Sequence, residues 1–470
     1  MGQLRSGVLS TFRLVWQAMG TLSLAADAAY LLTGVALFAL GATPLSILLG
    51  ILSYLAIMNT GYQFSKYIGS AGGYYTFVGK SLGGFMATFV AWNMLFYTLL
   101  GYSSFGFLGL ASFITLINPS LSSNPVYWVL ISIAAATISF LFTYFGIKIS
   151  TDYQILGGLI EVGVLLAGSV ALIIEAGSKN TLAVFTPKFV PGGFTQVMYS
   201  MIYSVVLFFG TVLSVTSLAE ETKDPNVSIR KALLNTIIVA GITLIIVSYA
   251  FTVAWGPQNM SSFANSPDPG LILFGKVSII LFILLAAVTI NSFMGYNVAV
   301  SNGTSRVFYA FARDGILFLP KKLADVHPKY GSPHYSALFV YITSLALALI
   351  FGAIFGPFTG GLVMLYMNAY AAYLEHIVAS IGLPFYAKKK GDFNIFSHLV
   401  IPIIAIAILI AVIISTFYPS PPSYPYNIAA YVGVAWIGAS ALMAYIEKVL
   451  HPQVVANAGQ YNILEKTKVN

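Results

Sequence analysis

The chain has 470 residues, of which 58% are hydrophobic and only 8% are charged, and its mean hydropathy is +0.87. Because a soluble domain carries roughly a quarter charged residues, this composition excludes a protein that faces water over its whole surface. The apolar runs are about 20 residues long and lack period-2 alternation, which predicts an all-α membrane protein that crosses the bilayer many times.

The sequence contains no cysteine, which excludes disulfides, zinc–thiolate sites and thiol catalysis. It also lacks a His-Glu-x-x-His metal motif, a Walker-type Gly-Lys run and an assembled nucleophile set. We therefore expect no enzyme activity, no cofactor and no metal. The N-terminal stretch has no signal-peptide layout with a cleavage site, so the first span is expected to be retained.

The apolar runs predict twelve transmembrane spans in chain order. Their expected ranges are 12–40, 44–66, 83–112, 127–147, 152–176, 195–219, 231–255, 271–303, 335–355, 359–383, 396–417 and 426–446.

Lysine and arginine separate by side when both termini are placed inside. The outer side then holds Lys179 and Lys188, with Lys276 near the outer end of span 8. The inner side holds the other nineteen: Arg5, Arg13, Lys66, Lys80, Lys148, Lys223, Arg230, Lys231, Arg306, Arg313, Lys321, Lys322, Lys329, Lys388, Lys389, Lys390, Lys448, Lys466 and Lys468. The positive-inside rule then predicts a cell-membrane protein with cytoplasmic termini. The net charge of +8 indicates contact with anionic lipid and does not imply nucleic acid.

Spans 1 and 6 carry small and polar residues near their middles. Span 1 would measure roughly 40 Å as a straight helix, which exceeds a hydrocarbon core of ~30 Å. Its central residues include Gly20, Thr21, Ser23 and Asp27, and those of span 6 include Gly210 and Thr211. Interrupted spans in two halves of a chain are typical of transporters built from inverted repeats. Alternatively, small residues only let neighbouring helices pack closely.

Three motifs on the predicted inner face resemble those of one family. They are SAGGYYTFVGKSLGG (70–84), SLAEETKDPNVSIRKAL (217–233) and SRVFYAFARDGILFLPKKLADVHPKYGSPHYS (305–336). They resemble the stretches after spans 2, 6 and 8 of the amino acid–polyamine–organocation (APC) superfamily of permeases. The resemblance covers about residues 10–450 and indicates a prokaryotic member.

The resemblance implies a leucine-transporter-like fold of twelve helices with a 5+5 inverted repeat. The expected parts are 1–178 (helices 1–5), 190–385 (helices 6–10), 394–447 (helices 11–12) and a cytoplasmic tail, 448–470. Helices 1 and 6 would be broken, since unwound backbone at mid-membrane is tolerated only where it lines a cavity. The implied function is secondary active transport of amino acids by alternating access, without enzyme activity. A polyamine or cationic amine carrier, a sodium-coupled symporter and a membrane sensor are the alternatives.

By the same resemblance, the substrate is expected between the two breaks. The candidate residues are Gly20, Thr21, Ser23, Ala25, Ala26, Asp27, Phe208, Phe209, Gly210, Thr211 and Val212. Many members carry Gly-Ser-Gly where this chain has Ala26-Asp27-Ala28, and Gly-Phe-Glu where it has Gly210-Thr211-Val212, which leaves the substrate open.

Two buried acids are candidates for proton coupling. Asp27 lies near mid-membrane, where a carboxylate costs about 2.5–3.5 kcal/mol on insertion scales. It is expected either to meet the substrate or to cap the outer half of helix 1, which would favour amine-bearing substrates. Glu161 is the acid deep in span 5 and is the leading proton carrier. The same resemblance makes sodium the rival ion, with Thr289, Asn291 and Ser292 of span 8 as its candidate ligands. Alternatively, the Thr and Ser hydroxyls bond carbonyls of their own helix.

Charged residues near the inner ends are expected either to form a gate or to be solvated. The gate candidates are Glu220, Glu221, Asp224, Arg306 and Arg313. The stretch that holds the two arginines is predicted to be a short amphipathic helix at the headgroups. Glu375 and His376 of span 10 are expected in the inner third, as a proton path or as helix-to-helix hydrogen bonds.

Overall fold

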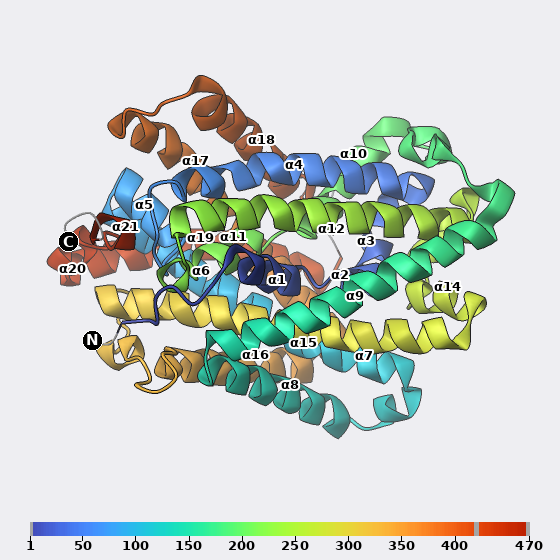
Figure 1. The fold of residues 1–470 in the computed structure, drawn as a ribbon, viewed down its shortest axis with the longest axis horizontal. Coiled ribbons are helices and arrows are strands. Elements are labelled where there is room, and N and C mark those ends of the chain that lie inside the picture. Colours follow the sequence, from blue (N-terminus) through green and yellow to red (C-terminus); the bar gives the residue numbers. More distant parts are fainter. Residues whose placement is uncertain (1–2, 418–422, 467–470) are drawn as a thin grey trace.

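The structure is a computed structural model that describes residues 3–417 and 423–466. Two of the lysines expected on the inner side cannot be placed: Lys468 lies outside the described residues, as does the side chain of Lys466. Most helices run along the long axis of the molecule, and both termini lie at the same end (Figure 1). Within the described ranges there is no sheet, and a single bridge joins Leu9 to Thr222.

Ten helices form the body of the bundle. They are α4 (Thr43–Phe64), α6 (Gly84–Gly101), α8 (Val126–Tyr144), α9 (Ile147–Ala176), α12 (Pro225–Trp255), α15 (Ile279–Asp314), α16 (His334–Phe355), α17 (Pro357–Lys389), α18 (Ile401–Ser415) and α19 (Tyr426–Leu450).

Shorter α-helices lie between them or at the chain ends. They are α1 (Thr11–Leu22), α2 (Leu24–Ala26), α3 (Leu32–Ala39), α5 (Tyr74–Leu82), α7 (Leu110–Ile117), α10 (Gly193–Val206), α11 (Thr211–Thr216), α13 (Met260–Ala264), α14 (Pro269–Val277), α20 (Pro452–Ala456) and α21 (Ile463–Lys466). Three segments are π-helical: η1 (Asp27–Leu31), η3 (Tyr102–Gly109) and η11 (Phe396–Val400). The 3₁₀ turns are η2 (Leu40–Ala42), η4 (Pro119–Ser123), η5 (Gly177–Lys179), η6 (Leu182–Phe185), η7 (Pro187–Phe189), η8 (Ala219–Glu221), η9 (Pro257–Asn259) and η10 (Lys321–Ala324).

Ten stretches of the described residues are long and apolar enough to cross a membrane. The first, Leu32–Phe64, joins the end of predicted span 1 to residues 44–64 of predicted span 2. The rest of span 1 is divided among short helices, so it does not count as one long apolar helix. Predicted span 10 forms the 33-residue helix α17, but Glu375, His376 and several tyrosines make it less apolar than its neighbours. The chain is therefore a multi-pass membrane protein.

Both spans in which the sequence predicts an interruption are interrupted. Helix α1 ends at Leu22, and Ser23 adopts a left-handed conformation with φ 53°. Helix α10 ends at Val206, and α11 begins only after Gly210, whose φ is 93°. A left-handed residue ends a right-handed helix, and a side chain resists that conformation. Glycine is thus the residue suited to position 210, whereas Ser23 is held there by its surroundings.

Basic residues from distant segments gather at the end of the bundle that holds both termini, which we call the terminal end. Arg5 donates to the Lys329 carbonyl at 3.2 Å, and Arg13 donates to the Lys148 carbonyl at 3.1 Å. The ion pairs Lys66–Asp392 (2.5 Å) and Lys80–Glu465 (2.6 Å) lie there as well. The opposite end is formed by turns that include η4, η5 to η7, and η9 with α13.

The prediction of a separate amphipathic helix after span 8 is wrong. Helix α15 continues without interruption to Asp314, and Arg306 has no exposed surface. Its guanidinium points inward because a buried carboxylate, that of Glu221, receives it.

Candidate functional site

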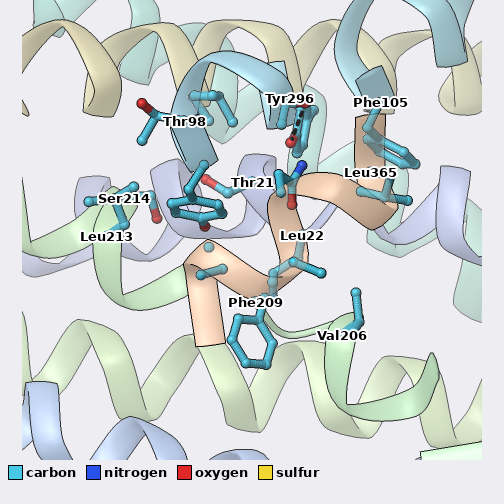
Figure 2. Close-up of a pocket in the computed structure, with 18 of the residues that line it drawn as sticks. Thr21, Leu22, Thr98, Phe105, Val206, Phe209, Leu213, Ser214, Tyr296 and Leu365 are labelled. Carbon is cyan, nitrogen blue, oxygen red and sulfur yellow. Dashed lines mark hydrogen bonds between the residues drawn. The ribbon is translucent and has the colours of Figure 1, made fainter. Parts of the chain in front are cut away.

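A cavity of about 120 Å³ lies between the two interrupted spans. Thr21 and Leu22 reach it from the end of α1, while Val206, Phe209 and Leu213 reach it from either side of the α10–α11 break (Figure 2). Thr98 of α6, Phe105 of η3, Tyr296 of α15 and Leu365 of α17 close the other sides (Figure 2). Two unwound segments and four further elements thus surround one small space.

Four of the eleven residues predicted to bind substrate line this cavity: Thr21, Asp27, Phe209 and Gly210. The other seven lie beside it. Gly20 packs against the Gln154 amide, Ser23 donates to the Ser292 carbonyl, and the backbone amides of Ala25 and Ala26 are bonded to span 5 and span 8 side chains. Phe208 packs on Tyr54, Thr211 donates to the Phe208 carbonyl, and Val212 faces Gly61. Neighbouring residues of a helical turn point in different directions, so a continuous stretch of sequence cannot all face one cavity.

The sequence did not predict the contributions of spans 3, 8 and 10. The additional lining residues that carry polar groups are Tyr97, Thr98, Ser214, Tyr296, Thr304, Asn368 and Tyr373. Tyr296 donates to the Gly101 carbonyl at 3.1 Å, and Asn368 is 4% exposed with its Nδ2 unpartnered among the described residues. A buried amide in an apolar span is the signal that could have identified Asn368.

Asp27 does not cap the second half of the broken span. Ser23 occupies the N-cap position of α2, and the Asp27 N–H donates to the Ser23 carbonyl at 3.0 Å. The Asp27 carboxyl group is 2% exposed, and its Oδ2 has no hydrogen-bond partner among the described residues. The capping alternative is therefore wrong, and a buried carboxyl group lines the cavity instead.

The group that does cap this half-helix is Glu161 of α9. Its Oε1 accepts the Ala25 N–H at 2.7 Å and the Ser292 hydroxyl at 2.8 Å, and the same hydroxyl accepts the Ala26 N–H at 3.3 Å. Glu161 and Ser292 thus link the second half of the broken span to α9 and α15, because they accept the N–H groups of Ala25 and Ala26. Backbone N–H groups at a helix start favour a negative group, which explains how this acid is held in an apolar bundle.

The span 8 residues proposed as sodium ligands divide into two groups. Thr289 directs its hydroxyl to the Ala25 carbonyl at 3.5 Å, and Ser292 contacts Glu161. Asn291 instead accepts a hydrogen bond from the Tyr153 hydroxyl at 2.9 Å and packs against Gly157. Two of the three thus lie at the break.

Four of the five predicted gate residues form ion pairs at the terminal end. Arg306 and Glu221 make a bidentate pair, with Nε–Oε2 at 2.7 Å and Nη2–Oε1 at 3.2 Å. Arg313 and Glu220 approach to 2.8 Å, and Glu220 also accepts the Ala71 N–H at 2.9 Å. The solvated alternative does not hold for these four. Asp224 lies exposed before α12, outside these pairs.

Glu375 and His376 differ in their surroundings. His376 Nδ1 lies 2.7 Å from the Tyr74 hydroxyl, a helix-to-helix hydrogen bond of the kind expected. Glu375 is 1% exposed, and its Oε2 is unpartnered within the described part of the chain.

A second cavity of about 410 Å³ extends from the site toward the opposite end. It shares Leu31, Val206, Leu365 and Tyr373 with the first cavity, and it reaches Ala264–Pro267 of the η9–α14 connection. Six of its lining residues are Tyr or Phe: Tyr203, Phe358, Tyr366, Tyr370, Tyr373 and Tyr426.

Residues 7–443 match the family model described as amino acid permease, and the chain belongs to this family. It is 26% identical to a branched-chain amino acid permease of Bacillus subtilis over 59% of this chain and 60% of that one. It is 25% identical to a low-affinity putrescine importer of Escherichia coli over 61% and 63%, so the alignments span less than two thirds of these two relatives. A methylthioribose transporter of Bacillus subtilis is 27% identical over 79% of this chain and 80% of its own. The relatives thus carry an amino acid, a diamine and a thiosugar, so membership alone does not define the substrate.

Proposed function

We propose that this protein is a secondary transporter that carries amino acids across the cell membrane by alternating access. The observation that carries the proposal is the cavity between two interrupted spans, lined by backbone breaks and by a buried carboxyl group. Such breaks expose backbone N–H and C=O groups at mid-membrane, where they can replace the water around a polar solute. In this proposal the chain has twelve spans, and residues 1–178 and 190–385 form inverted repeats. The terminal end then faces the cytoplasm, because most of the Lys and Arg lie there.

A carrier of polyamines or other amines is the second candidate. It is favoured by Asp27, because an acid with an unpartnered oxygen in the cavity wall attracts a cation. Both candidates are tested by counterflow in liposomes with a panel of labelled amino acids and amines. Saturable exchange of at least one of them is expected, and exchange of none would refute the transport proposal.

We further propose that protons drive transport and that Glu161 carries them, with Asp27 as the second candidate carrier. Glu161 holds the first amides of the second half of the broken span together with Ser292, so a change in its protonation alters contacts at the site itself. Sodium remains the rival, because Thr289 and Ser292 lie at the same place.

The two ions are distinguished by uptake into liposomes with an imposed pH gradient and no sodium. Wild type is expected to concentrate substrate, while Glu161→Gln only equilibrates it, since Gln accepts the same hydrogen bonds but binds no proton. A strict need for sodium, or accumulation by Glu161→Gln, contradicts the assignment.

A further inference from the structure

The cavity between the breaks is lined by a carboxyl group and, among the described residues, by no basic side chain. Of the described residues that line it, Asp27 is the acid and none is Lys, Arg or His. Asp27 is buried and its Oδ2 is unpartnered there. An unpaired carboxylate in an apolar setting is costly, so a cationic group of the ligand would be stabilised at this position.

Three of the amides that could bind a ligand carboxylate are already bonded to the protein. They belong to Ala25, Ala26 and Asp27, which follow Leu24 at the start of the second half-helix. They donate to Glu161 at 2.7 Å, to Ser292 at 3.3 Å and to Ser23 at 3.0 Å respectively. A ligand carboxylate here would have to displace Glu161 and then lie near a second acid, Asp27. Like charges in a low-dielectric site repel strongly.

A further polar group of the wall is a hydrogen-bond donor. Asn368 presents an unpartnered Nδ2 donor among the described residues, and it comes from α17. An N–H of this kind donates to an oxygen acceptor, a neutral carbonyl or hydroxyl included. The tyrosine rings of Tyr97, Tyr296 and Tyr373 supply aromatic surface, which is also compatible with an ammonium group.

We propose that the site selects a small organic ammonium ion without a free carboxylate, such as a primary amine or an amino acid amide, and that Asp27 is its cation subsite. This inference rests on the proposed transport function, and it favours the second of the two substrate classes. The Asn368 amide then holds the neutral oxygen of an amide ligand.

The test uses matched ligands that share one side chain and differ at the carboxylate or at the amine. Leucine, leucinamide, 3-methylbutylamine and 4-methylpentanoate are each titrated into the purified full chain, with thermal stabilisation as the measure of binding, and the alanine and phenylalanine series are treated likewise. In at least one series the amide and the amine are expected to bind at least tenfold more tightly than the amino acid, and the acid is expected not to bind.

Two variants place the effect at Asp27. Asp27→Asn is expected to lower amine affinity at least tenfold. Glu375→Gln removes another buried acid that does not line the cavity and is expected to leave the order of affinities unchanged. If the amino acids bind most tightly, the inference is overturned while the transport proposal stands. If no ligand of the panel binds or is exchanged, both are overturned.

A second inference concerns the segment 452–466, which the sequence presents as a polar tail. Asn462 accepts the Gly69 N–H and donates to the Tyr67 carbonyl, both at 2.9 Å. The Gly459 N–H donates to the Tyr75 hydroxyl at 2.7 Å and to Asp314 at 3.2 Å. The segment therefore bonds to the loop after α4, to α5 and to the end of α15 at once.

The same segment contacts the buried ion pairs of the terminal end. The Arg313 guanidinium lies 3.7 Å from the centre of the Tyr461 ring while it pairs with Glu220. Val455 and Ala458 are buried, and the Val455 carbonyl lies so close to Gly84 that a Cβ there would meet it at 1.8 Å. The segment is thus packed against the bundle at this end.

We infer that residues 452–466 form a latch that holds the terminal end closed and slows its opening. Because the chain has no cysteine, a single Ser217→Cys variant reports opening through its rate of maleimide labelling. Ser217 is buried beside Gly303 at this end.

In that background Asn462→Ala is expected to raise the labelling rate at least threefold and to change the rate of counterflow more than the KM. The matched control is Asn457→Ala, since Asn457 is exposed and its side chain donates to the Gln453 carbonyl inside the segment, with no hydrogen bond to the bundle among the described residues. Equal labelling of the Asn462→Ala variant and wild type would overturn the latch.

Discussion

The two ends of the bundle are closed by different physical means. At the terminal end, ion pairs join the buried Arg306 to Glu221 and the part-buried Arg313 to Glu220. Described residues near both chain ends contact these pairs: the Leu9 N–H donates to the Glu221 carbonyl, and the Tyr461 ring lies against Arg313. At the opposite end, a cavity of about 410 Å³, whose wall includes six aromatic side chains, leads to the site.

Under the proposed alternating access, this difference indicates how each end would open. Aromatic and aliphatic contacts are non-directional and tolerate small shifts, whereas a buried bidentate pair is either made or broken. The terminal end therefore resembles a switch with two discrete states, while the opposite end can open by degrees. In the described structure the terminal end is closed, and the opposite end contains the second cavity.

The largest expected effect comes from breaking the buried pair at the terminal end. Glu221→Ala leaves the fully buried Arg306 guanidinium without its partner, which destabilises the fold by about 3–5 kcal/mol. Thermal unfolding of the purified protein measures the loss. The double variant Glu221→Leu/Arg306→Met removes both charges and is expected to recover most of the stability; a double variant as unstable as Glu221→Ala would contradict this account.

The next effect lies at the site between the two ends. Gly210→Leu places a Cβ 2.7 Å from Thr21 Cγ2, at a φ of 93° that disfavours side chains. Ligand affinity is expected to fall at least tenfold, about 1.4 kcal/mol, as measured by the thermal shift titration. Gly163→Leu is the matched control, because a Cβ at Gly163 meets no atom within 4 Å. Unchanged affinity in a folded Gly210→Leu variant would show that the site lies elsewhere.

A smaller effect is expected at the opposite end. The hydroxyls of Tyr203 and Tyr366 lie 2.8 Å apart and join α10 to α17 beside the second cavity. Tyr203→Phe removes one hydrogen bond, worth about 0.5–1.5 kcal/mol, and is expected to speed maleimide labelling of a Thr33→Cys reporter in the cavity wall. Tyr445→Phe on the exposed face of α19 is the control. Slower labelling in Tyr203→Phe would mean that this contact does not hold the end closed.

The smallest effect belongs to an exposed pair at the terminal end. Hydrogen bonds from the Lys66 ammonium and the Tyr67 hydroxyl lower the pKa of Asp392 below its ordinary value, which is about 3.9. A lowered carboxyl pKa stabilises the folded state above the ordinary pKa, and this stabilisation is lost as the pH falls through the folded-state pKa. Asp392→Asn is therefore expected to lower the melting temperature slightly at pH 6, with the difference from wild type shrinking toward pH 3. A difference that grows on acidification would contradict the assigned cause.

Much of the fold could be predicted because its signals are local. Apolar run length, glycine placement and the side of each Lys and Arg predict long helices, two interruptions and a shared end for both termini. The interruptions appear where Gly210 and the residues before Asp27 suggested them. The pairing of Glu220, Glu221, Arg306 and Arg313 could also be anticipated, since opposite charges on one face of an apolar protein need partners.

The site could be predicted only in part. Asp27 and Gly210 were identified because a charge or a glycine stands out in an apolar span, whereas Tyr296 reaches the same cavity from span 8 and carries no signal of its own in a tyrosine-rich sequence. Asn368 of span 10 carries the signal of an amide in an apolar span, which the sequence prediction did not use. Glu161 caps a half-helix that belongs to another span. This role depends on how α9 packs against the break, and that packing cannot be predicted from the sequence of either segment alone.

The sequence by itself determined that this is a membrane protein of many helices, where two spans are interrupted, and that Asp27 and Glu161 lie deep in apolar spans, because these follow from local hydrophobicity and backbone preference. Tertiary structure decided which residues meet. Tertiary packing brings Glu161 to the backbone amide of Ala25 and leaves Asp27 facing the cavity. It also places the segment 452–466 against Arg313 of the ion pairs. The physical reason is that hydrogen bonds and ion pairs act over a few ångströms, so they are set by the packing of segments more than a hundred residues apart.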